Sequence, residues 1–597
     1  MLMALSNLYT TLKLGWSFGV AVTACVLSYV LWNGVRVLSG NRLSQMSLLE
    51  NNCMQSTASA AGYSTGGTVG SAFGALLLVT GEHQPWYVLT PMVLLTAALG
   101  VFVAIPMKRQ MINYEQLKFP SGIAAAETLR SLYAHGVEAA RKAYSLLGSF
   151  AIGGVIGILR HAGELADDLR VGGHPQVWME KILSIFGIPD LIEFPKRISQ
   201  SNGIKLAGMG FEPSVLLIGA GMLVGLRISL SMLASSALLY FIIVPKLLAL
   251  DAAHADLHGY VASLAIKGGI TNPARWALWG GTSIMLFSSL TSVALQWRTL
   301  ARAFVLRRNG SEEKSDAIGA VEVPMSWLFI GLVPITIGLV LVQWLAFHIN
   351  ALLGLLAVLM SFVVALVCCR ATGETDTTPI GAMGKLTQLL YSTLPGSAGS
   401  PVINLVTGGM TSAAGASAAD LLTDLKSGYL LGANARKQFL AQFVGVFFGT
   451  LAIVPAWYLI VPSKAVLESF NPPAANMWRA VAELLTKGWG ALPQTAISAI
   501  VVGAIFGVIL PLLERFFPRA QRFLPSAMGL GLGLVIPFQN SLSFALGAVL
   551  VFIWTKINSR GAETYNVSVA SGFVAGESLT SAILTILRTA LSLMIGK

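Results

Sequence analysis

Long apolar runs recur along this sequence and are separated by short polar breaks. A helix that crosses a membrane needs about 20 consecutive apolar residues, and runs close to that length occur roughly 14 times here. Only 11% of the 597 residues are charged, whereas soluble proteins carry about 25%. So few charges could not cover the water-exposed surface of a chain this long. The sequence therefore predicts an all-α polytopic membrane protein and excludes disordered, collagen-like, coiled-coil and disulfide-scaffold chains.

Broken or re-entrant segments are expected in addition to these spans. A helix that is interrupted at membrane depth is easily missed when spans are judged by apolar length. The apolar runs are 14–35, 56–79, 87–105, 145–159, 206–226, 228–250, 276–297, 325–349, 351–369, 439–461, 496–513, 524–538, 541–557 and 567–594.

Basic residues lie in the polar breaks rather than in one patch. The net charge is +12, but without a basic patch or tail it gives no reason to expect a nucleic-acid partner. Five arginines and lysines cluster between 298 and 314, and positive residues beside a span mark its cytoplasmic end. We therefore expect a first transmembrane repeat at 1–300, a basic cytoplasmic linker at 301–324, and a second transmembrane repeat at 325–597.

Internal similarity supports a duplication of the chain. With a shift of 312 residues, 211–242 aligns without gaps with 523–554, and 9 of the 32 positions are identical. A shift of 296 pairs 121–142 with 417–438, and the Ser-Leu-Thr-Ser sequence at 289–292 recurs 289 residues later. Repeated halves are characteristic of secondary transporters, whose substrate site lies between the repeats. The alignments leave open whether the repeats are parallel or inverted.

A polar, glycine-rich segment at 404–432 is the strongest candidate for chemistry. It is too polar to face lipid as a helix and too apolar for an ordinary loop, so we expect irregular backbone that is packed in protein or lines a water-filled cavity. Asp420 and Asp424 are four residues apart and would share one helix face. Two close carboxylates repel each other, which favours the protonated form of one of them and suits a proton carrier. The alternative is a helix cap or an interfacial salt bridge with Lys426.

Another break lies in the first half, at 113–130. Pro120, Ser121 and Gly122 interrupt the backbone there, and an alanine-rich helix follows. The N-terminus of that helix would present free N–H groups and a positive dipole end to an anionic group of a ligand. Ser121 could equally serve only as the N-cap of the helix.

A polar stretch at 48–62 leads directly into a span rich in Gly, Ala and Ser. With Glu50, Asn51, Asn52 and Gln55 it holds more polar groups than a turn requires, although a capped helix start would account for two of them. The amides are therefore candidates for substrate binding.

Two glutamates lie close to apolar runs. Glu577 interrupts the last run, and a charge inside a span usually lines a pathway or is paired, so it is a further candidate proton carrier. Glu212 precedes Pro213 at an expected helix start, where the helix dipole favours a carboxylate without any functional role. No metal site or cofactor is expected, because the four cysteines lack ligand spacing.

Several of these segments together resemble one family, the oligopeptide transporters. The similarity includes the yellow stripe-like metal–chelate branch and is greatest to bacterial members. The resemblance implies proton-coupled import of small peptides or peptide-like metal chelates across a cell membrane. It also implies a further helix that ends at Asn7-Leu-Tyr9, whereas only six residues precede Asn7 in this sequence. The stretches that carry the resemblance are Asn7-Leu-Tyr9 with Leu14-Gly15-Trp16, Glu50-Asn-Asn-Cys-Met-Gln-Ser-Thr-Ala-Ser-Ala60, Leu117-Lys-Phe-Pro-Ser-Gly122, Arg370-Ala-Thr-Gly-Glu-Thr-Asp376, Asn404, and Asp420 with Asp424-Leu-Lys-Ser-Gly-Tyr429.

The resulting hypothesis is a secondary transporter in the inner or plasma membrane that moves a small-molecule substrate together with protons. It has no cofactor, and a homodimer is left open. Substrate binding is assigned to Asn51, Asn52, Gln55, Phe119, Pro120, Ser121, Gly122 and Asn404, and proton coupling to Asp420, Asp424 and Glu577, with Lys426 as a charge partner.

Two alternatives come from other functional classes. An intramembrane enzyme would need a nucleophile–base pair or metal ligands within spans, and the seven histidines contain no HExxH motif. His254 and His258, with Asp251 and Asp256 nearby, could bind a metal, although a solvated loop explains them more simply. A channel would show flux that is uncoupled from protons and much faster than a conformational cycle.

Overall fold

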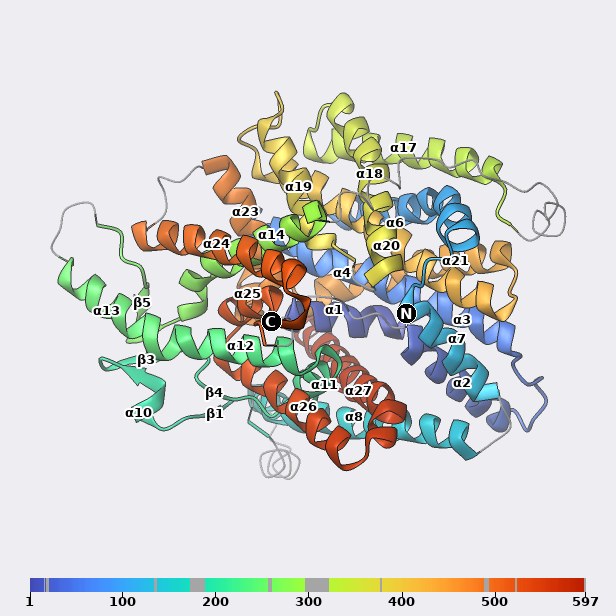
Figure 1. The fold of residues 1–597 in the computed structure, drawn as a ribbon, viewed down its shortest axis with the longest axis horizontal. Helices are drawn as coiled ribbons and strands as arrows, with labels where there is room; N and C mark the ends of the chain where they lie inside the picture. The colour runs from blue at the N-terminus through green and yellow to red at the C-terminus, as the bar shows by residue number, and fades with distance from the viewer. Residues whose placement is uncertain are drawn as a thin grey trace. The chain divides into compact units, whose positions relative to one another are not determined.

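Helices dominate the computed structural model of this chain (Figure 1). The structure describes residues 1–15, 17, 21–133, 137–171, 188–189, 191–255, 260–295, 322–375, 378–487, 493–520 and 523–594. Outside these residues lie most of the predicted linker 301–324, and also Trp16, Asp256, His258 and Asp376.

Contacts within the chain divide it into two compact units. Unit 1 consists of Met1–Tyr144 and Gln296–Thr486, and unit 2 of Ser145–Leu295 and Lys487–Lys597. Each unit therefore combines a stretch from the first half of the chain with a stretch from the second half. The predicted repeats are the two halves of the sequence, so they do not coincide with these spatial units.

Unit 1 is built from helices alone in its described part. The elements from the first half of the chain are α1 (Leu2–Leu14), α2 (Ala21–Leu38), α3 (Leu48–Ser59), η1 (Ala60–Thr65), α4 (Gly66–Thr68), η2 (Val69–Phe73), α5 (Gly74–Thr80), α6 (Trp86–Lys108), η3 (Arg109–Tyr114) and α7 (Pro120–Tyr133). Those from the second half are α17 (Met325–Phe347), α18 (Ala351–Thr375), α19 (Ile380–Thr393), α20 (Pro401–Leu431), α21 (Ala435–Ile460), α22 (Lys464–Phe470) and α23 (Pro473–Lys487).

Unit 2 contains long helices and a few very short strands. Its first-half elements are most of α8 (Val137–Val171), then β1 (Ile192–Glu193), α10 (Lys196–Ser199), β2 (Gln200–Ser201), β3 (Ile204–Leu206), β4 (Gly210–Phe211), α11 (Val215–Val224), α12 (Leu226–Leu238), η4 (Leu239–Ile243), α13 (Val244–Ala253), β5 (Ile266–Lys267), β6 (Ile270–Thr271) and α14 (Pro273–Leu295). Its second-half elements are α24 (Gln494–Phe516), η7 (Pro518–Ala520), α25 (Ala527–Val535), α26 (Phe538–Ile557) and α27 (Ser559–Met594).

The strands are an addition to the predicted all-α class. Strand β1 pairs antiparallel with β4, and β2, β3, β6 and β5 form a second small sheet in that order, in which only β3 and β6 run parallel. All six belong to connections between the helices of unit 2, so they do not change the helical architecture.

Among the described residues, nine helical stretches are long and apolar enough to cross a membrane. They confirm a helical membrane protein, but the predicted count of about 14 spans stays a prediction. Two predicted runs, 206–226 and 524–538, form only the 10-residue α11 and the 9-residue α25. The nine stretches are Trp86–Tyr114, Arg141–His161, Leu226–Ala253, Met325–Phe347, Ala351–Glu374, Ala435–Ile460, Gln494–Phe516, Phe538–Ile557 and Ser559–Ala590.

Helix α20 corrects the prediction of irregular backbone at 404–432. It is one continuous helix of 31 residues, and the hydroxyl of Ser400 caps its start by accepting a hydrogen bond from the Ile403 N–H. Every residue from Ile403 to Gly428 is buried, because α18, α6, α19 and α7 pack around it. The polar and glycine-rich composition therefore reflects a helix enclosed by protein rather than a broken one.

Small residues let the neighbours of α20 approach its backbone. A Cβ atom at Gly100 of α6 would lie 2.3 Å from the carbonyl oxygen of Ala414, and one at Gly408 of α20 would lie 3.0 Å from the carbonyl oxygen of Gly384 on α19. Contacts this short exclude larger side chains at both glycines.

Irregular backbone occurs instead between α3 and α5. The chain passes through two π-helical stretches, η1 and η2, on either side of the three-residue α4. These π turns lie within the segment rich in Gly, Ala and Ser that was predicted as a plain span.

One of the three sequence alignments, the one with a shift of 312 residues, places residues at corresponding positions in unit 2. Ser214 and Ser526 each cap a short helix, α11 and α25, by accepting from the N–H three residues ahead. A longer helix follows each of them, α12 and α26. The alignment with a shift of 296 residues fits less well, because it pairs the start of α7 with the interior of α20.

Candidate functional site

Two aspartates of α20 form the centre of the candidate site in unit 1. Asp420 accepts hydrogen bonds from the Ser59 hydroxyl of α3 (2.8 Å) and the Gln442 amide of α21 (3.1 Å). Asp424, one turn further, accepts one from the Gln55 amide at Oδ1, while its Oδ2 has no hydrogen-bond partner among the described residues. Both carboxylates thus lie on the side of α20 that packs against α3 and α21, as their spacing predicts.

Neutral polar groups surround this pair. Gln438 of α21 donates to the Ser56 hydroxyl (2.9 Å), and the Ser427 hydroxyl donates to the Asn52 side chain (2.9 Å). Asn51 instead donates to a backbone carbonyl of α2 (3.2 Å). Of the three predicted amides on α3, Asn52 and Gln55 therefore contact the α20 cluster, whereas Asn51 is turned toward α2.

No cation neutralises the two aspartates in the described part of the chain, where the ion pairs join other groups. The predicted partner, Lys426, is two positions beyond Asp424, which turns it roughly 200° around the helix. Its ammonium lies instead 5.7 Å from the ring centre of Tyr429. Burying two carboxylates without a cation is costly unless one of them carries a proton. The arrangement can therefore hold a proton and release it.

The predicted break at the start of α7 lies beside this cluster. Phe119 is fully buried with φ +45°, Pro120 is exposed and Ser121 is half-buried. Gly122 contacts α20 so closely that a Cβ atom there would lie 2.4 Å from the carbonyl oxygen of Thr423. The structure thus brings the 119–122 segment next to the turn of α20 that carries the aspartates.

Asn404 belongs to another part of α20. The sixteen residues between it and Asp420 (420 − 404) correspond to about 24 Å along a helix axis. Its amide donates to the carbonyl of Gln388 on α19 (2.6 Å). Asn404 is therefore separated from the other predicted substrate residues.

Glu50 has a structural role at the start of α3. Its N–H donates to the Ser47 hydroxyl (3.3 Å), and the Ser47 N–H donates to its carboxylate (2.7 Å). The bond from the Ser47 backbone, and then that from its hydroxyl, lowers the pKa of Glu50. This capping box confirms that a helix start accounts for part of the polar stretch at 48–62.

Glu577 lies in unit 2, within a buried ion cluster. Its Oε1 accepts from Arg160 of α8 (2.5 Å) and from the Ser214 hydroxyl (2.8 Å), and its Oε2 accepts from the Leu216 N–H (2.7 Å). Glu212 pairs with the same guanidinium (2.6 Å). A carboxylate with so many donors is suited to anchoring the chain before α11.

Comparison with known proteins identifies the family. A family model described as "OPT oligopeptide transporter protein" matches residues 1–588. The chain belongs to the oligopeptide transporter (OPT) family. This confirms the resemblance seen in the sequence. Because the OPT family and the relatives below are transporters, the enzyme alternative is set aside.

Curated relatives of this OPT chain come from bacteria, plants and yeast. A Haemophilus influenzae protein named "Putative oligopeptide transporter" is 23% identical over 638 residues, covering 97% of this chain and 92% of that protein. "Probable metal-nicotianamine transporter YSL13" of Oryza sativa subsp. japonica is 22% identical over 535 residues, covering 84% and 69%. "Putative oligopeptide transporter YGL114W" of Saccharomyces cerevisiae is 31% identical over 246 residues, and the match spans only 32% of that protein and 38% of this chain.

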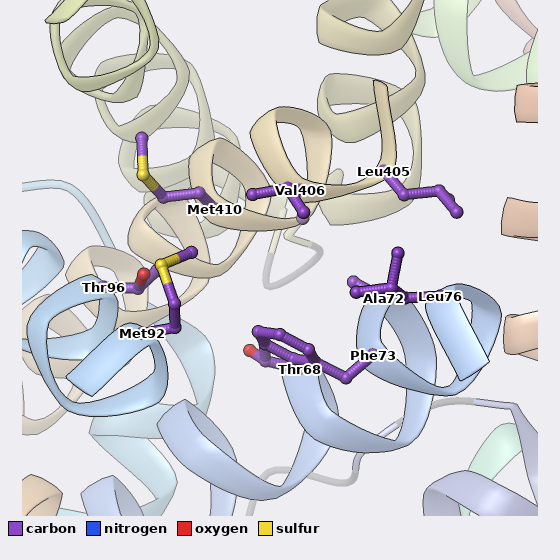
Figure 2. Close-up of a pocket in the computed structure, with 10 residues that line it drawn as sticks. Thr68, Ala72, Phe73, Leu76, Met92, Thr96, Leu405, Val406 and Met410 are labelled. Carbon is purple, nitrogen blue, oxygen red and sulfur yellow. The ribbon is translucent and has the colours of Figure 1, made fainter. Parts of the chain in front are cut away.

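A small pocket of the OPT chain lies beside another stretch of α20 (Figure 2). Figure 2 shows Met92 of α6 and Met410 of α20 on one side of it and Phe73 on another. The lining of the pocket is mostly apolar. Within the described residues, no three or more His, Cys, Asp or Glu side chains are placed to hold a metal ion. The pocket is lined by Thr68, Ala72, Phe73, Leu76, Met92, Thr96, Leu405, Val406, Gly409 and Met410.

Sequence reasoning missed several polar residues of this OPT chain. Gln438 and Gln442 lie four residues apart at the start of an apolar run, which is a detectable pattern for two amides on one helix face. Ser59 is one of many small polar residues and carries no comparable pattern. Lys385 and Gln388 lie on α19, which has only 14 residues and is too short to be recognised as a span.

Proposed function

We propose that this OPT family member is a proton-coupled symporter that imports small peptides or peptide-like metal chelates across the inner or plasma membrane. The observation that carries the proposal is the buried pair Asp420 and Asp424, which only neutral hydroxyl and amide groups contact among the described residues. Buried acids in transporters mark proton and substrate pathways. A carboxylate that binds a proton on one side and releases it on the other couples transport to the proton gradient.

The proposed substrates follow from chemistry and from the names of the relatives. One relative is named an oligopeptide transporter and another a metal-nicotianamine transporter. Asn52, Gln55 and the start of α7 are proposed to contact the substrate, because they lie beside the aspartates. Their amide and backbone groups suit a peptide-like ligand, which offers both donors and acceptors.

The proposed architecture is a duplicated transporter of about 14 spans with a cytoplasmic linker near 301–324. Matching helix caps at Ser214 and Ser526 support the duplication. Glu577 is proposed to anchor unit 2 rather than to carry the transported proton, because Arg160 already pairs with it.

Uptake into proteoliposomes tests the proton assignment. Asp420→Asn and Asp424→Asn should each abolish accumulation driven by an inward proton gradient, because an amide cannot take up and release the proton. Exchange of labelled for unlabelled substrate should persist, since it needs no net proton movement. Accumulation and the internal pH are followed together, with and without a protonophore.

Glu468→Gln is the matched control, because Glu468 is an exposed acid of unit 1 and its loss should leave coupling intact. Proton-dependent accumulation that survives in both aspartate variants would remove these residues from the mechanism. Flux that is rapid and indifferent to the proton gradient would instead favour the channel alternative.

A further inference from the structure

A buried lysine, Lys385, lies inside unit 1. Lys385 of α19 is 6% exposed, and no hydrogen bond or ion pair to its ammonium is found within the described residues. Burying a lone charge in a membrane protein is costly, so such a residue is retained where it meets a counter-charge during function. The protein itself supplies no such counter-charge in the described part of the chain.

Unpartnered amide atoms accompany this lysine. Gln388 follows Lys385 by three residues, which places both on the same side of α19. Gln388 is fully buried, and neither its Oε1 nor its Nε2 has a hydrogen-bond partner among the described residues. Asn404 of α20 is 1% exposed, and its Oδ1 likewise lacks a partner there. Its Nδ2 donates to the Gln388 carbonyl (2.6 Å), which joins the two helices at this point.

Helix α23 adds an aromatic side chain, Trp478, to the same region. A Cβ atom at Gly384 would lie 2.2 Å from Cη2 of Trp478, and one at Gly408 would lie 3.2 Å from Cζ3 of the same ring. The indole therefore lies against both glycines, next to Lys385 on α19 and one turn beyond Asn404 on α20. Helices α19, α20 and α23 of unit 1 therefore meet at Gly384, the residue before Lys385 in the sequence.

We propose that Lys385, Gln388 and Asn404 form a subsite for a carboxylate group of the transported substrate. The inference rests on the proposed function, and it adds the chemical group that is recognised and the residues that recognise it. The ammonium supplies the counter-charge and the Gln388 Nε2 donates to a carboxylate oxygen. The Gln388 Oε1 and Asn404 Oδ1 can accept from an amide or amine N–H near that carboxylate, so all the orphaned atoms gain partners.

This subsite is distinct from the aspartate cluster. Asp420 and Asn404 lie on sides of α20 that differ by roughly 160°, as sixteen residues at 100° each require. Asp420 is held by α3 and α21, whereas Asn404 contacts α19. The acids are placed for protons, and the Lys385 subsite is placed for an anionic group.

Ligand binding to the full chain in detergent tests the inference directly. The probes are trialanine and trialanine amide, which differ only in the terminal carboxylate, and the nickel–nicotianamine complex. The wild type should bind trialanine more tightly than its amide. Lys385→Met should weaken trialanine and the chelate by roughly 10- to 100-fold, the loss expected for a charge-assisted hydrogen bond, and should leave the amide unchanged. Lys437→Met, which removes an exposed lysine of unit 1, should change nothing.

Thermal unfolding without ligand gives a second, independent readout. If Lys385 has a counter-charge only when a substrate is bound, Lys385→Met should raise Tm of the ligand-free protein, because it removes an unpaired buried charge. Gln388→Glu should also raise Tm, by supplying an internal carboxylate three residues away, and should block trialanine. A Tm that falls by several degrees in Lys385→Met would overturn the inference, since the lysine would then be a structural partner.

The two readouts separate this inference from the proposed function. Loss of trialanine and amide binding to the same extent, or an undiminished preference for the free acid in Lys385→Met, overturns the subsite alone. A wild type that binds none of the probes contradicts the proposed substrates, and the unfolding arm still decides the role of Lys385.

Discussion

A single guanidinium holds two buried carboxylates in unit 2. Arg160 pairs with Glu212 (2.6 Å) and Glu577 (2.5 Å), and all three side chains are at most 5% exposed. Gln539 adds an amide donor to Glu212 (3.1 Å). Removing the cation would leave two buried carboxylates without their counter-charge, which costs more than the net stabilisation given by the pairs themselves.

Arg160→Met should therefore lower the free energy of unfolding by about 3–5 kcal/mol. The variant Arg160→Met with Glu212→Gln and Glu577→Gln should recover part of that loss, because neutral amides need no counter-charge. Unfolding in detergent followed by tryptophan fluorescence measures both. If the triple variant is less stable than Arg160→Met, buried charge is not the source of the loss.

Residue spacing predicted the aspartate pair but not its surroundings. The four-residue interval between Asp420 and Asp424 fixes their common face, because helix geometry is local. The same geometry turns Lys426 away from the pair, because it lies two positions beyond Asp424. Ser59 comes from a helix distant in sequence, and Gln438 and Gln442 come from the helix that follows α20, so no pattern within α20 could pair them with the aspartates.

At the scale of elements, two reciprocal helix crossings in unit 2 match each other closely. A Cβ atom at Gly221 of α11 would lie 2.1 Å from the Phe544 carbonyl oxygen on α26. At Gly533 of α25 it would lie 2.2 Å from the Met232 carbonyl oxygen on α12. Both pairs are related by the 312-residue shift of the alignment (533 − 221 and 544 − 232). The contacts therefore support the duplication in atomic detail.

Gly221→Ala and Gly533→Ala should each lower the stability of the protein by about 1–3 kcal/mol, because an added methyl group forces the crossing helices apart. Gly148→Ala is the matched control, since a Cβ atom at this helical glycine of α8 meets nothing within 4 Å. It should be neutral, or more stable by about 0.5–1 kcal/mol, from the better helix propensity of alanine. Equal Tm values for all three variants would contradict the close crossings.

Hydropathy predicted the long apolar helices and failed for the buried, polar helix α20. In the apolar windows of α17 and α18 only 22% and 50% of the residues are buried inside the protein, so large apolar side chains remain on the surface of both helices and make them easy to recognise. α20 is buried by other helices, and its surface therefore consists of small and polar residues rather than large apolar ones.

At the scale of the whole molecule, neither half of the sequence contains a complete unit. Unit 1 joins Met1–Tyr144 to Gln296–Thr486, and unit 2 joins Ser145–Leu295 to Lys487–Lys597. The faces that one half buries inside a unit are covered by helices of the other half, such as α3 by α21 and α11 by α26. Stability should therefore depend on both halves being present.

A chain divided between residues 310 and 311 tests this dependence. The two fragments produced together should assemble into a stable complex that melts in one transition, whereas each fragment alone should aggregate or be degraded, because its helices lack their packing partners. Size-exclusion chromatography and unfolding curves distinguish the cases. A monodisperse, folded 1–310 fragment would contradict the interleaved arrangement.

The many small residues on the surface of α20 have a further consequence for the motion of its neighbours. Glycine and alanine lose almost no rotamer entropy when they are buried, so enclosing this helix freezes few side chains. Few large side chains of α20 interdigitate with its neighbours, so few would have to be displaced before either helix shifts. A small slide or rotation of the helices around α20 therefore requires little repacking, so these helices can shift within unit 1 while α20 keeps its position.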